Sequence, residues 1–201
     1  MPSIAGVLLA AGQGSRFGRP KALVELDGQT LAERGVGMLQ AGGADPVLIV
    51  TGAAQIDVGP DHRVRAVYND EWRTGMGSSL RAALRALSDP EVSAVVVALA
   101  DQPLIGAEAV TRLIAAHRAG ASVAVAAYDG RPRNPVLLAR EHWLEVMSMA
   151  SGDQGARAFL RARPDLVTLV ECGDTGRPDD IDTPADLEHI AIREPGSPSC
   201  G

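Results

Sequence analysis

Apolar and polar positions divide the chain into short apolar runs and amphipathic segments. The run at residues 4–11 has too few polar positions for an exposed face, which is typical of a strand buried on both faces of a parallel sheet. Further strands are expected at residues 46–51, 64–68, 92–100, 122–127 and 166–170. Residues 131–137 break the pattern and are not assigned to a strand or a helix.

Helices are expected between these strands. Thr30 and Glu33 form a capping-box pattern for a helix that would end near the next glycine pair. Apolar residues at a helical spacing follow from Leu80, so a second helix is expected to start at Ser78 or Ser79. The remaining helices are expected at residues 108–119 and 141–149, near residue 157, and after residue 183.

This alternation predicts the fold class. Strands that alternate with helices favour a single-domain, Rossmann-like, three-layer α/β/α sandwich with a mostly parallel central sheet. The domain is expected to cover residues 1–192. Residues 193–201 (REPGSPSCG, from the arginine onward) are expected to form a disordered tail.

Composition excludes several classes of function. The 201 residues are 46% hydrophobic and 22% charged, which is ordinary for a soluble globular domain. A net charge of −6 and 3% aromatic residues disfavour nucleic-acid binding, which needs a basic face and stacking platforms. No apolar run approaches the roughly 20 residues of a membrane span. Cys172 and Cys200 fit no metal-ligand spacing, and with no recognisable signal peptide they predict a cytoplasmic protein.

The first strand leads into a glycine-rich, basic loop. Gly12, Gly14 and Gly18 are interleaved with Arg16 and Lys21. Glycines allow consecutive N–H groups to face one anion, and the cations would neutralise a polyphosphate. The dinucleotide fingerprint and the Walker A spacing are both absent. The residues alone therefore suit either a phosphate site or an ordinary strand-to-helix loop with solvated arginines.

The run LAAGQGSRFGRPK, residues 9–21, resembles the signature loop of the MobA-like nucleotidyltransferases, L-A-[AG]-G-x-[GS]-x-R-[MF]-G-x-x-K. These enzymes join an NTP to a sugar phosphate or a molybdopterin. The resemblance implies a nucleotide-diphospho-sugar transferase-like fold and a loop that wraps the triphosphate, with Arg16 and Lys21 at the phosphate oxygens. The NTP-binding residues that it implies are Leu9, Ala10, Ala11, Gly12, Gln13, Gly14, Ser15, Arg16, Lys21, Gly77, Ser78 and Ser79.

Two aspartates are expected to hold a metal. Asp101 directly follows the strand at residues 92–100, where open α/β sheets bind ligands. The run LADQPL resembles the family's [LA]-x-D-x-P motif, whose aspartate binds the magnesium of the NTP. DIDTP resembles a motif of the pterin branch and implies Asp182 as a second Mg²⁺ ligand. The resemblance thus makes Arg16, Lys21 and Asp101 catalytic. Without it, Asp182 could equally be a solvated residue before a helix cap at Thr183.

Three further segments resemble the molybdopterin branch. Residues 68–80 resemble its nucleotide-pocket lining, although glycine and serine also simply start helices. Residues 131–137 resemble an acceptor-contacting segment, and GDQGAR, residues 152–157, matches the cytidylyltransferases. The acceptor-binding residues implied are Asn134, Pro135 and Asp153. Asp153 could instead be a helix N-cap.

The implied reaction is attack by an acceptor phosphate oxygen on the α-phosphorus of an NTP, releasing pyrophosphate. An anionic nucleophile needs positioning and charge neutralisation rather than a strong base, which agrees with motifs that lack histidine. The motifs favour CTP, with GTP possible, and a molybdopterin acceptor. A molybdoenzyme or its chaperone would then be a partner. The alternatives are a guanylyltransferase, a sugar-1-phosphate nucleotidyltransferase, or a non-catalytic protein that delivers the cofactor.

Overall fold

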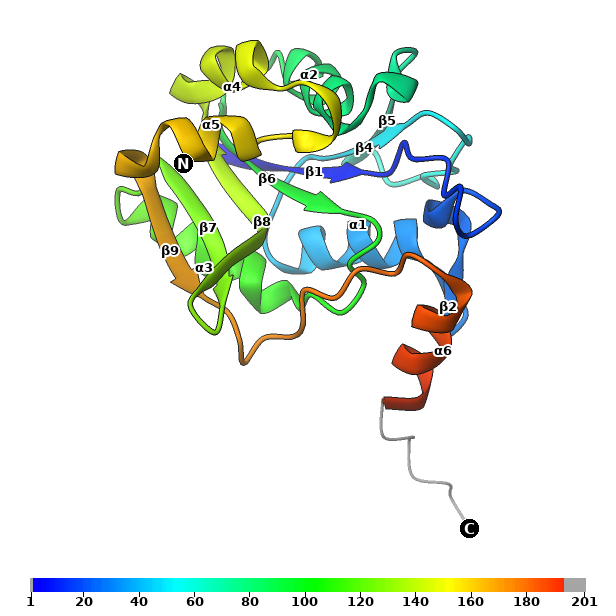
Figure 1. Cartoon of the computed structure of the whole chain (residues 1–201). Helices are drawn as coiled ribbons and strands as arrows, with labels where there is room; N and C mark the ends of the chain where they lie inside the picture. Colours follow the sequence, from blue (N-terminus) through cyan, green and yellow to red (C-terminus); the bar gives the residue numbers. More distant parts are fainter. Residues whose placement is uncertain (1, 194–201) are drawn as a thin grey trace.

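A computed structural model describes residues 2–193, in which a seven-stranded sheet lies between two layers of helices (Figure 1). The strands of this sheet are β1 (Ser3–Leu9), β4 (Val47–Thr51), β5 (Val64–Tyr68), β6 (Val92–Leu99), β7 (Val123–Tyr128), β8 (Arg131–Ala139) and β9 (Val167–Glu171). The helices are α1 (Leu31–Ala41), α2 (Met76–Ala86), α3 (Ala107–Arg118), α4 (Trp143–Met149), α5 (Arg157–Ala162) and α6 (Pro184–Arg193). A small hairpin of β2 (Glu25–Leu26) and β3 (Gln29–Thr30) lies outside the sheet.

The strand order is β5-β4-β1-β6-β8-β7-β9. Strands β5, β4, β1 and β6 pair in parallel, as do β7 and β9, whereas β8 runs antiparallel to both of its neighbours. Most of the pairings are therefore parallel. The single-domain α/β/α sandwich with a mostly parallel sheet is confirmed.

Strand β8 corrects the expectation for residues 131–137. This segment forms most of a nine-residue strand inside the sheet, although it contains Pro132 and Pro135. Its first three residues are exposed and its last five are buried, so only the second half shows an apolar pattern. Asp129 and Gly130, with φ of 53° and 72°, form the tight turn that returns the chain from β7 to β8.

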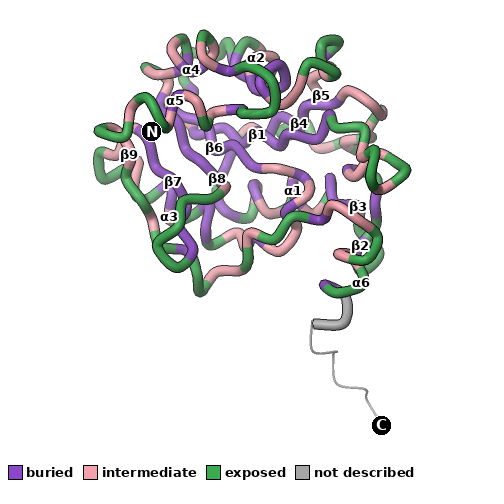
Figure 2. Tube along the Cα trace, viewed as in Figure 1, coloured by how far each residue is buried: buried purple, intermediate pink, exposed green. Residues whose placement is uncertain are grey.

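The helices cover the two faces of the sheet unequally. Helices α1 and α3 pack on one face and α2, α4 and α5 on the other (Figure 1). The central strands are buried along most of their length (Figure 2). The capping box of Thr30 and Glu33 is present at the start of α1, as expected. Helix α2 begins at Met76, two or three residues before the predicted start at Ser78 or Ser79.

The C-terminal segment packs beside the small hairpin. Thr183 and Asp186 exchange the hydrogen bonds of a capping box at the start of α6. Ile181 and Ile190 are buried with Val24 and Leu26 in a cluster separate from the main core. The tail predicted for residues 193–201 lies outside the described residues except for Arg193, the last residue of α6.

The topology fixes where a ligand would bind. Strands β1 and β6 are parallel neighbours with Leu9 beside Leu99, so the loop after β1 and Asp101 after β6 emerge at the same edge. The chain order reverses between these two strands, which is the point where open α/β sheets bind ligands. No helix in the described part of the chain is both long and apolar enough to cross a membrane.

Candidate functional site

One lysine holds two distant carboxylates together. Lys21 Nζ lies 3.1 Å from Asp101 Oδ2 and 2.5 Å from Asp182 Oδ1. Arg16 adds a longer contact of 3.6 Å from Nη1 to Asp182 Oδ2, between exposed side chains. The structure therefore brings together Arg16, Lys21, Asp101 and Asp182 from the loop after β1, the end of β6 and the segment before α6.

A backbone bond places Asp182 against Asp101. The N–H of Ile181 donates to the carbonyl oxygen of Asp101 at 2.8 Å, and the Ile181 side chain is fully buried. The acidic segment is thus anchored by an apolar side chain while its carboxylates stay near the sheet edge. A solvated acidic run would not need such an anchor.

The charge balance keeps Lys21 protonated. Partial burial by itself lowers the pKa of Lys21, but the hydrogen bond to Asp182 and the charge of Asp101 oppose it and raise the pKa above its usual value. The side chain is 19% exposed, so the ammonium is available at the surface of the site. It is a fixed positive charge next to two carboxylates.

The glycine-rich loop depends on Gly14. This residue has φ of +63°, and a Cβ there would lie 2.1 Å from the carbonyl oxygen of Arg19. Its own carbonyl accepts hydrogen bonds from Phe17 and Gly18. Among the described residues, none accepts a hydrogen bond from the N–H groups of residues 12–15. Unpaired N–H groups in a tight turn are suited to an anion.

This loop forms one wall of a cavity of about 430 Å³, which we call the loop cavity. Lys21 and Asp101 lie at one side of it, and Trp72, Arg73 and Ser79 line it from the start of α2 and the turn before it. The Arg73 guanidinium lies 4.4 Å from the Trp72 ring centre. The predicted residues Leu9, Ala10, Ala11, Gly12, Gln13, Gly14 and Ser15 also line it.

The start of α2 has a structural as well as a lining role. Buried Asn69 donates from Nδ2 to the hydroxyl oxygens of Ser78 (2.8 Å) and Ser79 (3.0 Å). Ser78 also donates to the carbonyl oxygens of Glu71 and Gly75, so its hydroxyl is engaged within the turn. Gly77 packs against the backbone of Ser151, and neither Gly77 nor Ser78 lines the loop cavity.

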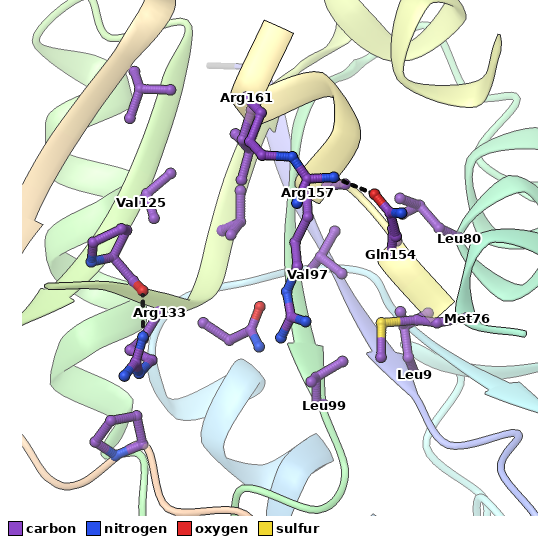
Figure 3. Close-up of a pocket in the computed structure, with 18 of the residues that line it drawn as sticks. Leu9, Met76, Leu80, Val97, Leu99, Val125, Arg133, Gln154, Arg157 and Arg161 are labelled. Atoms are coloured by element: carbon purple, nitrogen blue, oxygen red, sulfur yellow. Dashed lines mark hydrogen bonds between the residues drawn. The ribbon is translucent and has the colours of Figure 1, made fainter. Parts of the chain in front are cut away.

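A second cavity of about 790 Å³ adjoins the first, and we call it the arginine cavity. Apolar side chains from β1, β6, β7 and β8 form its floor, and Arg133, Arg157 and Arg161 line it (Figure 3). Leu9, Met76 and Leu99 line both cavities, so the two spaces meet over the ends of β1 and β6.

The loop at residues 151–157 divides the two cavities. Asp153 lines the loop cavity, whereas Gln154 and Arg157 line the arginine cavity. Asp153 caps no helix, because the N-cap of α5 is Ala156 and no side chain caps it. Of the other predicted acceptor residues, Asn134 lines the arginine cavity and Pro135 is buried within β8.

The carboxylates fit a hard divalent cation. Asp101 and Asp182 offer oxygen donors around one point of positive charge, and Mg²⁺ is usually bound by one or two carboxylates together with substrate phosphates and water. No group of three or more acidic, histidine or cysteine side chains within residues 2–193 forms a metal cage. An ion here would share its coordination with a phosphate ligand.

Sequence patterns gave no role to several side chains of the site. Asp180 lines the arginine cavity and accepts a hydrogen bond from Gln102 Nε2 at 2.7 Å. Burial raises the pKa of Asp180, against that hydrogen bond, which lowers it. Arg157 ends the GDQGAR run, so a signal for it was present in the sequence. Nothing in the pattern showed that it would face a cavity.

The chain is similar in sequence to a family of nucleotide-using transferases. A family model described as the MobA-like NTP transferase domain matches residues 6–167. The chain is 40% identical to the nicotine blue oxidoreductase of Paenarthrobacter nicotinovorans, over 91% of this chain and 94% of that protein. It is 38% identical to a probable molybdenum cofactor guanylyltransferase of Opitutus terrae, over 64% of this chain and 62% of that protein.

Solved structures agree with the fold. The Rv0371c homologue from Mycobacterium sp. strain JC1 superposes with a TM-score of 0.81 at 30% identity, covering 94% of this chain and 95% of that one. The Rv0371c complex with manganese from Mycobacterium tuberculosis superposes with a TM-score of 0.73 at 25% identity, covering 95% and 99%. A protein of this fold therefore crystallises with a divalent metal.

Proposed function

Because the chain belongs to the MobA-like NTP transferase family, we propose that it transfers a nucleoside monophosphate from an NTP to the phosphate of a molybdopterin-type acceptor. CTP is our first choice of donor and GTP the second, and pyrophosphate is the leaving product. The observation that carries the proposal is the convergence of Lys21, Asp101 and Asp182 beside the glycine-rich loop.

The loop cavity takes the donor. Its unpaired N–H groups at residues 12–15 bind the triphosphate oxygens, and the charges of Arg16 and Lys21 stabilise the departing pyrophosphate. Trp72 and Arg73 also line this cavity, and we propose that the nucleoside lies against them. These groups position the NTP and neutralise the charge of its phosphates, and phosphoryl-type transfer requires little else from the protein.

Asp101 and Asp182 would hold Mg²⁺, the cofactor that we propose. When bound, the ion polarises the α-phosphate. The protein contributes two carboxylates whose separation is set by the bond from Ile181 to Asp101. Lys21 then balances their charge from the loop side.

The arginine cavity takes the acceptor. It is larger than the loop cavity and meets it at Leu9, Met76 and Leu99, which allows two substrates to approach each other. Its apolar floor and cationic side chains suit a bulky organic body that carries phosphate. We propose that the product passes to a molybdoenzyme or its chaperone, and that the reaction takes place in the cytoplasm.

Pyrophosphate release tests the proposal. The full chain is assayed with Mg²⁺, molybdopterin and each of CTP, GTP, ATP and UTP, and separately with sugar 1-phosphates as acceptors. Pyrophosphate release with CTP supports CTP as the donor, and release with GTP instead would make GTP the donor. Release only with a sugar 1-phosphate would show that the acceptor is a sugar phosphate and not molybdopterin. Binding of NTP and molybdopterin without release identifies a non-catalytic delivery protein.

A second function rests on one relative. The 40% identity to nicotine blue oxidoreductase spans nearly the whole chain, more than the match to the guanylyltransferase. An oxidoreductase would place an organic substrate in the arginine cavity and a nucleotide cofactor in the loop cavity. Oxidation of reduced nicotinamide dinucleotides in the presence of a quinone or nicotine blue, without any NTP, would favour this function over transfer.

A further inference from the structure

Arg157 is one of three arginines that line the arginine cavity. It is the first residue of α5, and its side chain extends away from the helix into the arginine cavity, toward Leu99 (Figure 3). Arg161, one helical turn later, donates instead to Gln154. Arg163 pairs with Glu145. Within the described residues, no hydrogen bond or ion pair engages the guanidinium of Arg157.

The fold fixes the backbone from which the Arg157 side chain extends. Helix α5 is anchored by Phe159, which is fully buried. The loop before it packs on the start of α2, where a Cβ at Gly77 would lie 2.6 Å from the backbone nitrogen of Ser151. The cavity wall beside Arg157 is apolar and includes Val97 and Leu99. Arg157 is exposed, so its guanidinium is open to a ligand, and its planar set of N–H donors can pair with the two oxygens of a phosphate.

The location of Arg157 suggests which anion it binds. Leu99 and Met76 belong to both cavities, so an anion on the guanidinium would lie where the acceptor meets the donor. The triphosphate itself would be held on the far side of this boundary by the loop and Lys21. The acceptor is the substrate that would bring a phosphate from the arginine side.

We infer that Arg157 is the specificity-determining residue that binds the acceptor's phosphate and orients it for attack. The inference rests on the proposed function. In the reaction, an oxygen of that phosphate forms the new bond to the donor's α-phosphorus as the bond to the β-phosphate oxygen breaks. The electron pair of the broken bond leaves with pyrophosphate. Acceptors without an anionic group are then poor substrates.

The test separates acceptor binding from donor binding. Dissociation constants for molybdopterin and for CTP are measured on the full chain, together with pyrophosphate release, for the wild type, Arg157→Met and Arg157→Lys. Arg118→Met is the control, because Arg118 is an exposed arginine on α3 and its loss changes the net charge equally. Arg157→Met should weaken molybdopterin binding and raise its KM by about 10–100-fold. Affinity for CTP should stay within about twofold, and lysine should restore part of the loss.

The outcomes distinguish the inference from the proposed function. If Arg157→Met binds molybdopterin as the wild type does, within about threefold, the inference is wrong even when the wild type releases pyrophosphate. If the wild type binds molybdopterin through Arg157 but releases no pyrophosphate with any NTP, the proposed transferase activity is wrong, and the part of the inference that stands is phosphate binding by Arg157. A wild type that does not bind molybdopterin overturns both.

Discussion

Lys21 and Asp101 are 80 positions apart in the sequence, yet Lys21 Nζ lies 3.1 Å from Asp101 Oδ2. The pairing of β1 with β6 makes this contact possible, because both strands end at the same edge of the sheet. Asp182 joins the pair from 161 positions beyond Lys21. Three segments of the chain therefore meet at one charged cluster.

Asp101→Asn should lower kcat/KM for pyrophosphate release by about 1,000-fold, since a lost ion ligand removes several kcal/mol of transition-state stabilisation. Asp179→Asn is the matched control, because Asp179 is exposed and paired with Arg177. Retention of Asp101→Asn activity within about tenfold, a barrier change of ~1.4 kcal/mol, would show that Asp101 is no metal ligand.

Asp182→Asn should change the dependence on Mg²⁺ rather than abolish activity. Its side chain is 45% exposed, so water can replace part of its coordination. The Mg²⁺ concentration for half-maximal activity should rise by about tenfold. EDTA should stop the wild type reversibly. An unchanged Mg²⁺ titration curve for the variant would assign Asp182 only to the ion pair with Lys21.

Much of this cluster could be predicted from the sequence, because each part has a local signal. The glycine-rich loop has a long sequence motif of several residue types, and Asp101 directly follows an apolar run that predicts a strand. The sequence could not show that Lys21 would bridge Asp101 and Asp182, since their proximity depends on strand order and on the bond from Ile181.

Strand β8 and the arginine cavity were harder to predict for a physical reason. The exposed start of β8 contains two arginines and Pro132, and it pairs with β7 but not with β6, so no apolar pattern marks it. Arg157 is polar and sits at the start of a six-residue helix. Which way its side chain points depends on the packing of the preceding loop against α2, which local sequence does not encode.

Gly77→Ala tests that packing. A Cβ at this position would lie 2.6 Å from the Ser151 nitrogen, so either the loop or the helix must shift. We expect a loss of about 1–3 kcal/mol in the free energy of unfolding, measured by urea denaturation. Gly37→Ala in α1 is the control, because its Cβ would meet nothing within 4 Å. That variant should gain about 0.4–1 kcal/mol. Equal behaviour of the two variants would contradict the close packing.

Glu171 should make the free energy of unfolding depend on pH in the acid range. Hydrogen bonds from the N–H groups of Gly130, Gly173 and Asp129 hold the pKa of this carboxyl below its ordinary value of 4.5. A carboxyl whose pKa is lowered by folding stabilises the fold fully at pH values above its unfolded-state pKa. That contribution is lost as the pH falls through the folded-state pKa. Glu171→Gln should therefore lower the urea midpoint near neutral pH, and the difference from the wild type should shrink in acid. Glu91→Gln, at an exposed site, is the control for removing one negative charge.

Asp153 tests how the two cavities divide the substrates. The resemblance assigns it to the acceptor, but its side chain lines the loop cavity, and a Cβ at Gly75 would lie 2.7 Å from its Oδ1. A carboxylate there can accept hydrogen bonds from the amino group of a base or from the ribose hydroxyls. We expect Asp153→Asn to raise KM for the NTP by about tenfold, with KM for molybdopterin within about twofold. Steady-state kinetics with each substrate varied in turn measures both. If only the KM for molybdopterin rises, Asp153 binds the acceptor. The loop at residues 151–157 would then have to move when substrates bind.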